Sequence, residues 1–175
     1  TENEWPQFKE VAKTLYRGKP EDVERFRQEY LLGVGQIEVL KALGVKPDAL
    51  HLNEGFGAFG AIGLIKYYME QEGLNIDEAL AIVKEQTVFT THTLEAAALE
   101  RLKLDIVRDH LRAYFAGVPG ADVGGLVEHV IRLGTQRDDN ELTFLPSRFC
   151  INVTQDGRRN AVSELNAQKA TQALG

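Results

Sequence analysis

Ala49-Leu50-His51-Leu52-Asn53, with the adjoining Glu54-Gly55-Phe56-Gly57, decides the fold that this sequence predicts. The first five residues form a short apolar run that ends in polar groups, which is typical of a buried strand. The glycines after it predict a tight turn, and the apolar residues from Ala58 to Glu70 predict a helix beyond the turn. We therefore expect the first strand and helix of an α/β unit here.

A second strand is predicted at Thr87-Val88-Phe89-Thr90-Thr91, where β-branched and aromatic residues follow one another. A second helical pattern, from Asp77 to about Gln86, precedes it, so the two strands are expected to be parallel and joined by a crossover. In such sheets, ligands bind at the carboxyl ends of the strands. Here these ends are Asn53-Glu54-Gly55 and Thr91-His92-Thr93, which are both polar.

The rest of the chain is predicted to be mostly helical. Gly33 and Gly35 lie inside a long helical pattern that ends near Gly44, and because each costs about 1 kcal/mol relative to alanine, we expect close packing there. The whole chain, 1–175, is expected to form a single three-layer, Rossmann-like α/β domain with a short parallel sheet and many helices. The remaining expectations are an N-terminal extension (1–20), helices over 93–115 with a break near Lys103 and over 122–133, loop over most of 135–148, a strand at 149–153, and a helical tail (160–175).

Composition excludes several classes of protein. Hydrophobic residues make up 43% and charged residues 26% of the 175 residues, which is typical of a globular domain. The formal net charge is -6, and basic residues are mixed with acidic ones, so we expect no nucleic-acid partner. Cys150 is the one cysteine, and no apolar run approaches the roughly 20 residues of a membrane span. The polar start is unlike a signal peptide, so a cytoplasmic protein is expected.

Two segments are candidates for binding phosphate. Gly55, Gly57 and Gly60 form a G-x-G-x-x-G pattern between a predicted strand and a predicted helix, the context required for nucleotide binding. Glu54 would place a negative charge beside the pyrophosphate, so tight helix–strand packing is the favoured interpretation and nucleotide binding the alternative. Arg158-Arg159, after Gly157, could also bind a phosphate, but an exposed basic turn is favoured.

His92 is the main candidate for binding a sugar. It lies at a predicted strand end between Thr91 and Thr93, where its two ring nitrogens could serve as donor and acceptor for hydroxyl groups. The alternative is a histidine that satisfies nearby backbone groups. Glu54 is either an acid or base or a helix-initiating carboxylate. No metal site is predicted, because no two histidines are three or four residues apart.

Four segments together resemble the α-glucan phosphorylases, the family of glycogen, starch and maltodextrin phosphorylases. Residues 25–35, R-F-R-Q-E-Y-L-L-G-V-G, resemble the family's R-L-R-Q-E-Y-x-L-G-x-G helix, and residues 51–59, H-L-N-E-G-F-G-A-F, resemble its H-L-N-E-G-H-S-A-F segment. Residues 88–93 resemble its F-T-T-H-T strand end, and residues 160–166 weakly resemble its N-G-V-S-x-L-H. The segments follow one another in the family's order and spacing.

The resemblance implies part of the N-terminal domain of a two-domain (GT-B) glycosyltransferase. The family transfers a glucosyl unit from an α-1,4-glucan to inorganic phosphate and uses pyridoxal phosphate. The resemblance implies that His92 hydrogen-bonds the sugar, with Asn53, Glu54 and Thr91 nearby, and that glucose or an α-glucan is a partner. No cofactor is expected in this chain, because the family's cofactor lysine motif and phosphate-binding residues lie in the other domain and nothing here matches them. We therefore expect a fragment or degenerate relative without activity alone.

The departures from the family are also informative. Phe56 and Asn166 each stand where the family has histidine, and Leu94-Glu95-Ala96-Ala97 replaces a proline-rich segment. The stretch between Thr154 and Asn160 is shorter than the apolar helix that the family has there. A half-enzyme should also expose apolar surface, so the alternative function is a non-catalytic module that forms a homodimer or docks on a partner domain.

Overall fold

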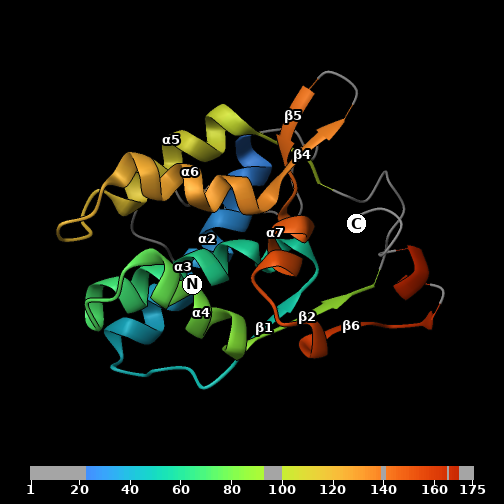
Figure 1. Cartoon of the computed structure of the whole chain (residues 1–175), viewed down its shortest axis with the longest axis horizontal. Helices are drawn as coiled ribbons and strands as arrows, with labels where there is room; N and C mark the ends of the chain where they lie inside the picture. The colour runs from blue at the N-terminus through green and yellow to red at the C-terminus, as the bar shows by residue number, and fades with distance from the viewer. Residues whose placement is uncertain (1–22, 93–99, 139–140, 165, 170–175) are drawn as a thin grey trace.

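Two small sheets organise the computed structural model (Figure 1), which describes residues 23–92, 100–138, 141–164 and 166–169. The first sheet is parallel and has the order β1-β2-β6. Its strands are β1 (Leu50–Asn53), β2 (Thr87–Thr91) and β6 (Arg159–Ala161). The second sheet is antiparallel and consists of β3 (Leu102–Lys103), β5 (Glu141–Phe144) and β4 (Thr135–Asp138), in that spatial order.

The predicted α/β class, with a short parallel sheet and many helices, is confirmed. β1 and β2 occupy the predicted positions, and the parallel register places Leu52 opposite Phe89 and Asn53 opposite Thr90. The arrangement is consistent with part of a Rossmann-like domain. The helices are α2 (Val23–Ala42), α3 (Ala58–Gln71), α4 (Ile76–Gln86), α5 (Leu104–Phe115), α6 (Val123–Gly134) and α7 (Pro146–Asn152), with 3-10 turns η1 (Gly55–Gly57) and η3 (Asp156–Arg158).

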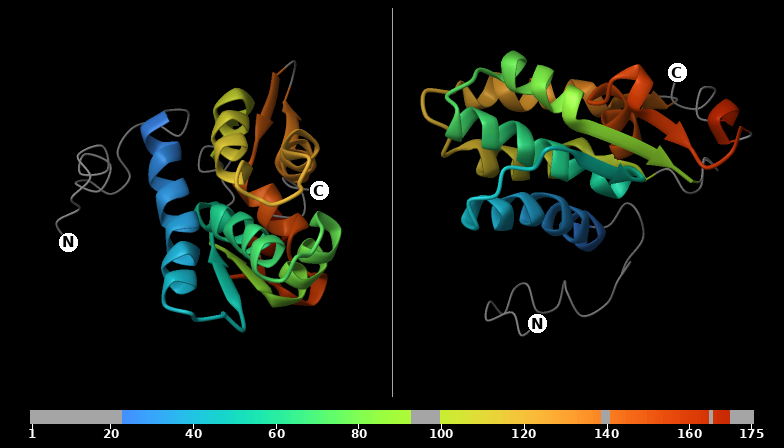
Figure 2. Two further views of the ribbon diagram at one scale, coloured as in Figure 1. Left: turned by 90° about the vertical axis from the view of Figure 1, so that its left-hand side faces the viewer. Right: turned by 90° about the horizontal axis from the view of Figure 1, so that it is seen from below.

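α3 is the central helix of the core. Its residues from Ala58 to Ile65 are all buried, as expected of a helix that is apolar on every side. α2 lies along α3 (Figure 2), and the two backbones meet at Gly33, where a Cβ atom would come within 2.6 Å of Phe59. Close packing is therefore confirmed at Gly33, whereas Gly35 has only a side-chain atom of Leu31 within 4 Å, at 3.8 Å.

One face of the parallel sheet is buried and the other is open among the described residues. Leu50, Leu52 and Phe89 point into the core, whereas His51 and Asn53 alternate onto the opposite face and are exposed. A parallel sheet is normally covered on both faces, so an exposed polar face is unusual for a sheet of this kind.

Two predictions for the C-terminal half are wrong. The stretch 149–153 is not a strand, because Pro146 begins helix α7 and Phe149, Cys150 and Val153 are buried at helical spacing. Residues 135–148 are not mostly loop, because they contain the β4–β5 pair and the start of α7. The third parallel strand is β6 instead, which follows η3.

Some predictions fall on residues that the structure does not describe. The N-terminal extension (1–20), the helix start at 93–97 and the last residues of the tail lie outside the described residues. The predicted break near Lys103 is present as β3, and α5 begins at Leu104.

Candidate functional site

The carboxyl edge of the parallel sheet brings the predicted sugar-binding residues together. Asn53 is aligned with Thr90, so β1 and β2 end side by side and Glu54 lies next to Thr91 and His92. β6 continues this edge, because Ala161 lies opposite Thr91 on the other side of β2. The segments after all three strands therefore meet at one place.

Glu54 has a strained backbone at this edge. Its φ is 63° and its ψ is 178°, and among the described residues it is the one non-glycine residue with positive φ. Such conformations cost about 1–3 kcal/mol and cluster at functional sites. The backbone N–H of Glu54 donates to the Thr90 carbonyl at 2.9 Å. This bond holds Glu54 against β2, where its side chain meets the residues that follow the strand.

The Glu54 carboxylate binds His92 and Thr91. Oε1 accepts the backbone N–H of His92 at 2.5 Å and lies 3.2 Å from the ring Nδ1 of the same residue. Oε2 accepts the hydroxyl of Thr91 at 3.4 Å. Both carboxylate oxygens thus accept hydrogen bonds, and charge-assisted bonds of this kind are stronger than neutral ones.

This pairing determines which hydrogen bond His92 can offer to a ligand. A neutral imidazole whose Nδ1 donates to a carboxylate has an unprotonated Nε2, which is an acceptor. The side chain of His92 is 43% exposed, so it is accessible from solvent. The arrangement is suited to accepting a hydrogen bond from a hydroxyl group.

Asn166 is a member of this site that the sequence did not predict as a site residue. Its side-chain Nδ2 donates to the backbone carbonyl of His92 at 2.5 Å. The signal in the sequence is that Asn166 stands where the family that the chain resembles has histidine. It could not be placed at the site without β6, which brings residues 159–161 beside β2.

The exposed sheet face next to the site is polar. Nε2 of His51 lies 2.8 Å from the hydroxyl of Thr90. Asn53, which pairs with Thr90 in the register of β1 and β2, is exposed. Asn53 thus lies at the same sheet edge as His92. Its amide is accessible for hydrogen bonding to a ligand.

The glycines of the G-x-G-x-x-G pattern are in close contact with neighbouring elements. A Cβ at Gly55 would lie 2.8 Å from the Ser147 hydroxyl, and one at Gly57 would lie 3.1 Å from Leu52. A Cβ at Gly60 would lie 2.6 Å from the amide nitrogen of Gln36. These contacts favour the packing interpretation over a phosphate-binding turn.

The two candidate arginines lie in and beside a short turn. Arg159 begins β6, and its guanidinium binds the Thr154 carbonyl at 2.9 Å and the Asp156 carboxylate at 2.7 Å. Arg158 is exposed in η3. Arg159 therefore fixes its own turn, which is consistent with the favoured interpretation of a basic turn.

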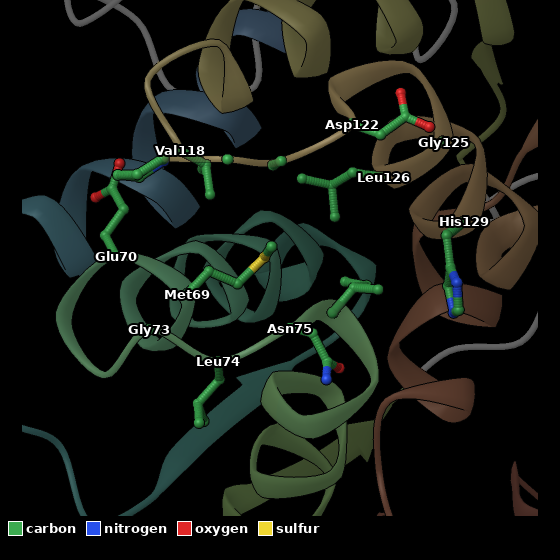
Figure 3. A pocket seen from close by; sticks show the side chains of 14 residues that line it. Met69, Glu70, Gly73, Leu74, Asn75, Val118, Asp122, Gly125, Leu126 and His129 are labelled. Carbon is green, nitrogen blue, oxygen red and sulfur yellow. The ribbon is translucent and has the colours of Figure 1, made fainter.

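A cavity of about 570 Å³ lies away from this edge (Figure 3). It is formed between the end of α3, the start of α4 and the loop into α6, and Met69 and Leu126 approach it from opposite sides. A helix that follows a parallel strand runs back toward the strand's amino end, so this cavity is at the opposite end of the fold. It contains none of the predicted site residues.

The described residues offer no cluster of three His, Cys, Asp or Glu side chains that could hold a metal ion. None of the described helices is both long enough and apolar enough to cross a membrane.

No protein-family model matches the chain. Maltodextrin phosphorylase from Thermococcus litoralis is 34% identical over 163 residues, which are 93% of this chain and 18% of that protein. Glycogen phosphorylase from Mycobacterium tuberculosis is 30% identical over 92% of this chain and 19% of its own length. Glycogen phosphorylase from Aquifex aeolicus is 29% identical over 79% of this chain and 19% of its own length.

The chain therefore spans about a fifth of the length of these relatives. The agreement extends well beyond the short segments that carry the resemblance, because it includes more than nine tenths of this chain in two of them. The chain belongs to the α-glucan phosphorylase family and corresponds to one region of the maltodextrin and glycogen phosphorylases.

Proposed function

We propose that this chain forms one wall of a sugar-binding site and takes glucose or the end of an α-glucan. The observation that carries the proposal is the Glu54–His92 pair, in which the carboxylate contacts both the backbone N–H and the ring Nδ1 of His92. This pair leaves Nε2 as an exposed acceptor for a sugar hydroxyl. Asn53, exposed at the same edge, supplies an amide that can both donate and accept.

Binding by the chain alone is expected to be weak. Ligand sites usually bury most of the ligand's surface, whereas this wall is open and both His92 and Asn53 are exposed. We further propose that the chain does not catalyse phosphorolysis by itself. Transfer to phosphate requires preorganised positive charge around the phosphate, and the formal net charge of this chain is -6. The complete reaction is assigned to a polypeptide of the relatives' length.

A titration with glucose and maltoheptaose, followed through backbone amide shifts, tests the binding proposal. We expect shifts at His92 and Asn53 in the unmodified chain and their loss in His92→Ala. His129→Ala is the matched control, because His129 lines the distant cavity and should leave the shifts unchanged. Saturating sugar that moves no resonance near His92 would eliminate the proposal.

The exposed outer side of α2 favours a second candidate function, self-association. Leu32 and Val39, in α2, and Leu43, directly after its end, are 58–70% exposed and lie seven and four residues apart. Exposed apolar patches drive association, so we propose that the isolated chain pairs with a second copy through these side chains. Light scattering should give a mass that rises with concentration and falls in the triple variant Leu32→Ser, Val39→Ser, Leu43→Ser. A monodisperse monomer at high concentration would contradict this candidate.

A further inference from the structure

A group of charged side chains is buried behind the Glu54–His92 edge. Arg25 and Glu29 on α2, with Glu100 just before β3, are each at most 8% exposed, and we call them the buried charge cluster. Nε and Nη2 of Arg25 both approach Oε1 of Glu100, at 2.7 and 2.5 Å. Arg25 Nε also lies 3.1 Å from Oε1 of Glu29, but its one hydrogen is directed to Glu100.

The cluster has too many acceptors for its donors. Both carboxyl oxygens of Glu29 and Oε2 of Glu100 have no hydrogen-bond partner within the described part of the chain. The two carboxyl groups nevertheless lie beside the same nitrogen, because Arg25 Nε is 3.1 Å from Oε1 of Glu29 and 2.7 Å from Oε1 of Glu100. Two facing carboxylates offer only lone pairs, so no hydrogen bond can form between them unless one carries a proton.

The charges of the cluster also indicate that one of the two carboxyl groups carries a proton. Two carboxylates and one guanidinium leave one negative charge in excess, and a buried charge without a partner is strongly unfavourable. One proton on the carboxyl pair removes the excess charge and also supplies the missing donor.

Two described neighbours of the cluster are an aromatic ring and a thiol. Phe56, in η1, places its ring 4.7 Å from the Arg25 guanidinium. From α7, the Cys150 thiol faces the same region, and burial raises its pKa, with a smaller contribution from the charges of Glu29 and Glu54, so it remains neutral. Burial and the neighbouring Glu100 carboxyl together raise the pKa of Glu29 to about 10, against the lowering effect of Arg25.

We infer that Glu29 and Glu100 share one proton at neutral pH, and that this acid pair, bound to Arg25, positions the two segments that carry Glu54 and His92. The described link passes through the turn that Glu54 begins, because Phe56 in that turn packs on Arg25 and Glu54 accepts the backbone N–H of His92. The three residues are therefore positioning residues, and the inference does not depend on sugar binding.

Infrared spectroscopy of the folded chain with ¹³C-labelled glutamate tests the shared proton. At neutral pH we expect the carbonyl band of one protonated glutamic acid, which should disappear in Glu29→Gln. It should also disappear in Glu100→Gln, because one carboxylate then balances one guanidinium. Glu24→Gln is the matched control, since this exposed glutamate is on the same helix and its replacement should leave the band. Absence of the band from the unmodified chain overturns the inference without any variant.

The positioning role needs a separate measurement at His92. Glutamine keeps the shape and hydrogen-bonding capacity of a protonated Glu29, so Glu29→Gln should leave the His92 amide resonance in place. Glu29→Ala removes the contact to Glu100 and should shift that resonance. An unchanged His92 amide in a folded Glu29→Ala variant overturns the positioning role. If Glu29→Ala does not fold, Glu29→Asp, which withdraws the carboxyl group from Glu100, takes its place, and an unchanged His92 amide in that variant overturns the role as well.

Discussion

Asn166 donates its side-chain amide to the backbone carbonyl of His92 at 2.5 Å, although 74 positions separate the two residues in sequence. The backbone N–H of His92 donates in turn to the Glu54 carboxylate. His92 is thus fixed by groups that follow two different strands, β1 and β6. Its orientation depends on the assembly of the whole parallel sheet.

Asn166→Ala should loosen His92 without unfolding the chain. One hydrogen bond to a partly exposed carbonyl is lost, and we expect a destabilisation of about 0.5–1 kcal/mol in urea unfolding. Hydrogen exchange at the His92 amide should become faster. Asn53→Ala is the control, because the Asn53 side chain makes no hydrogen bond within the described residues. Equal exchange rates in the two variants would show that Asn166 does not restrain His92.

Replacements of Glu54 separate backbone strain from side-chain bonding. Glu54→Ala and Glu54→Gly both remove the carboxylate, but only glycine accepts φ near 63° and ψ near 178° without strain. We expect the glycine variant to be more stable than the alanine variant by about 1 kcal/mol in urea unfolding, even though glycine costs entropy in the unfolded chain. An alanine variant as stable as the glycine variant would mean that the residue relaxes to another conformation.

Both Glu54 variants should also change the tautomer preference of the His92 ring. Without the carboxylate, Nδ1 loses the partner that selects its tautomer. Ring ¹⁵N shifts should therefore move from one dominant tautomer to a mixture. Identical ring shifts in the unmodified chain and in both variants would contradict the assigned tautomer.

Glu29 should make the chain less stable as the pH rises. The pKa of its carboxyl is raised, first by burial and then by Glu100, from 4.5 to about 10. Between these values the folded state binds a proton that the unfolded state has released. The stabilisation that this proton contributes is therefore complete below about pH 4.5, and it decreases steadily as the pH rises to about 10. The loss approaches about 1.4 kcal/mol per pH unit at most.

Thermal unfolding at pH 6 and pH 9 checks this dependence on acidity. Glu29→Gln cannot titrate, so we expect its melting temperature to exceed that of the unmodified chain at pH 9 and the difference to shrink at pH 6. Glu24→Gln should show the pH dependence of the unmodified chain. A Glu29→Gln variant that is less stable at pH 9 would indicate an ionised Glu29 in the folded state.

Two glycines of α2 provide a matched test of the α2–α3 contact. A Cβ at Gly33 would lie 2.5 Å from the backbone nitrogen of Gly60, so Gly33→Ala must separate α2 from α3. Overpacking of this kind costs about 1–3 kcal/mol. Gly35→Ala meets nothing closer than 3.8 Å and should stabilise the helix by up to about 1 kcal/mol. Urea unfolding of both variants measures the difference, and similar values would contradict the described packing.

Local sequence was sufficient for the elements that present one clear pattern. β1, β2, α3 and α4 lie where apolar runs, β-branched residues and turn signals predicted them, because these patterns reflect short-range geometry. The parallel pairing followed from the helices between the strands. The meeting of Asn53, Glu54 and His92 at one edge followed in turn, since parallel strands end on the same side.

Only the tertiary structure decided the features that depend on distant partners. Phe149 to Val153 fits both a strand and a helical turn, and its burial beside α3 and α6 determines that it is helical. β6 is short and polar, so its place beside β2 comes from pairing alone. Glu54 binds His92 because β1 and β2 are adjacent, and Arg25 meets Glu100 because α2 packs against the core. Sequence determines local conformation through short-range sterics, whereas contacts across many residues exist only after the chain has closed on itself.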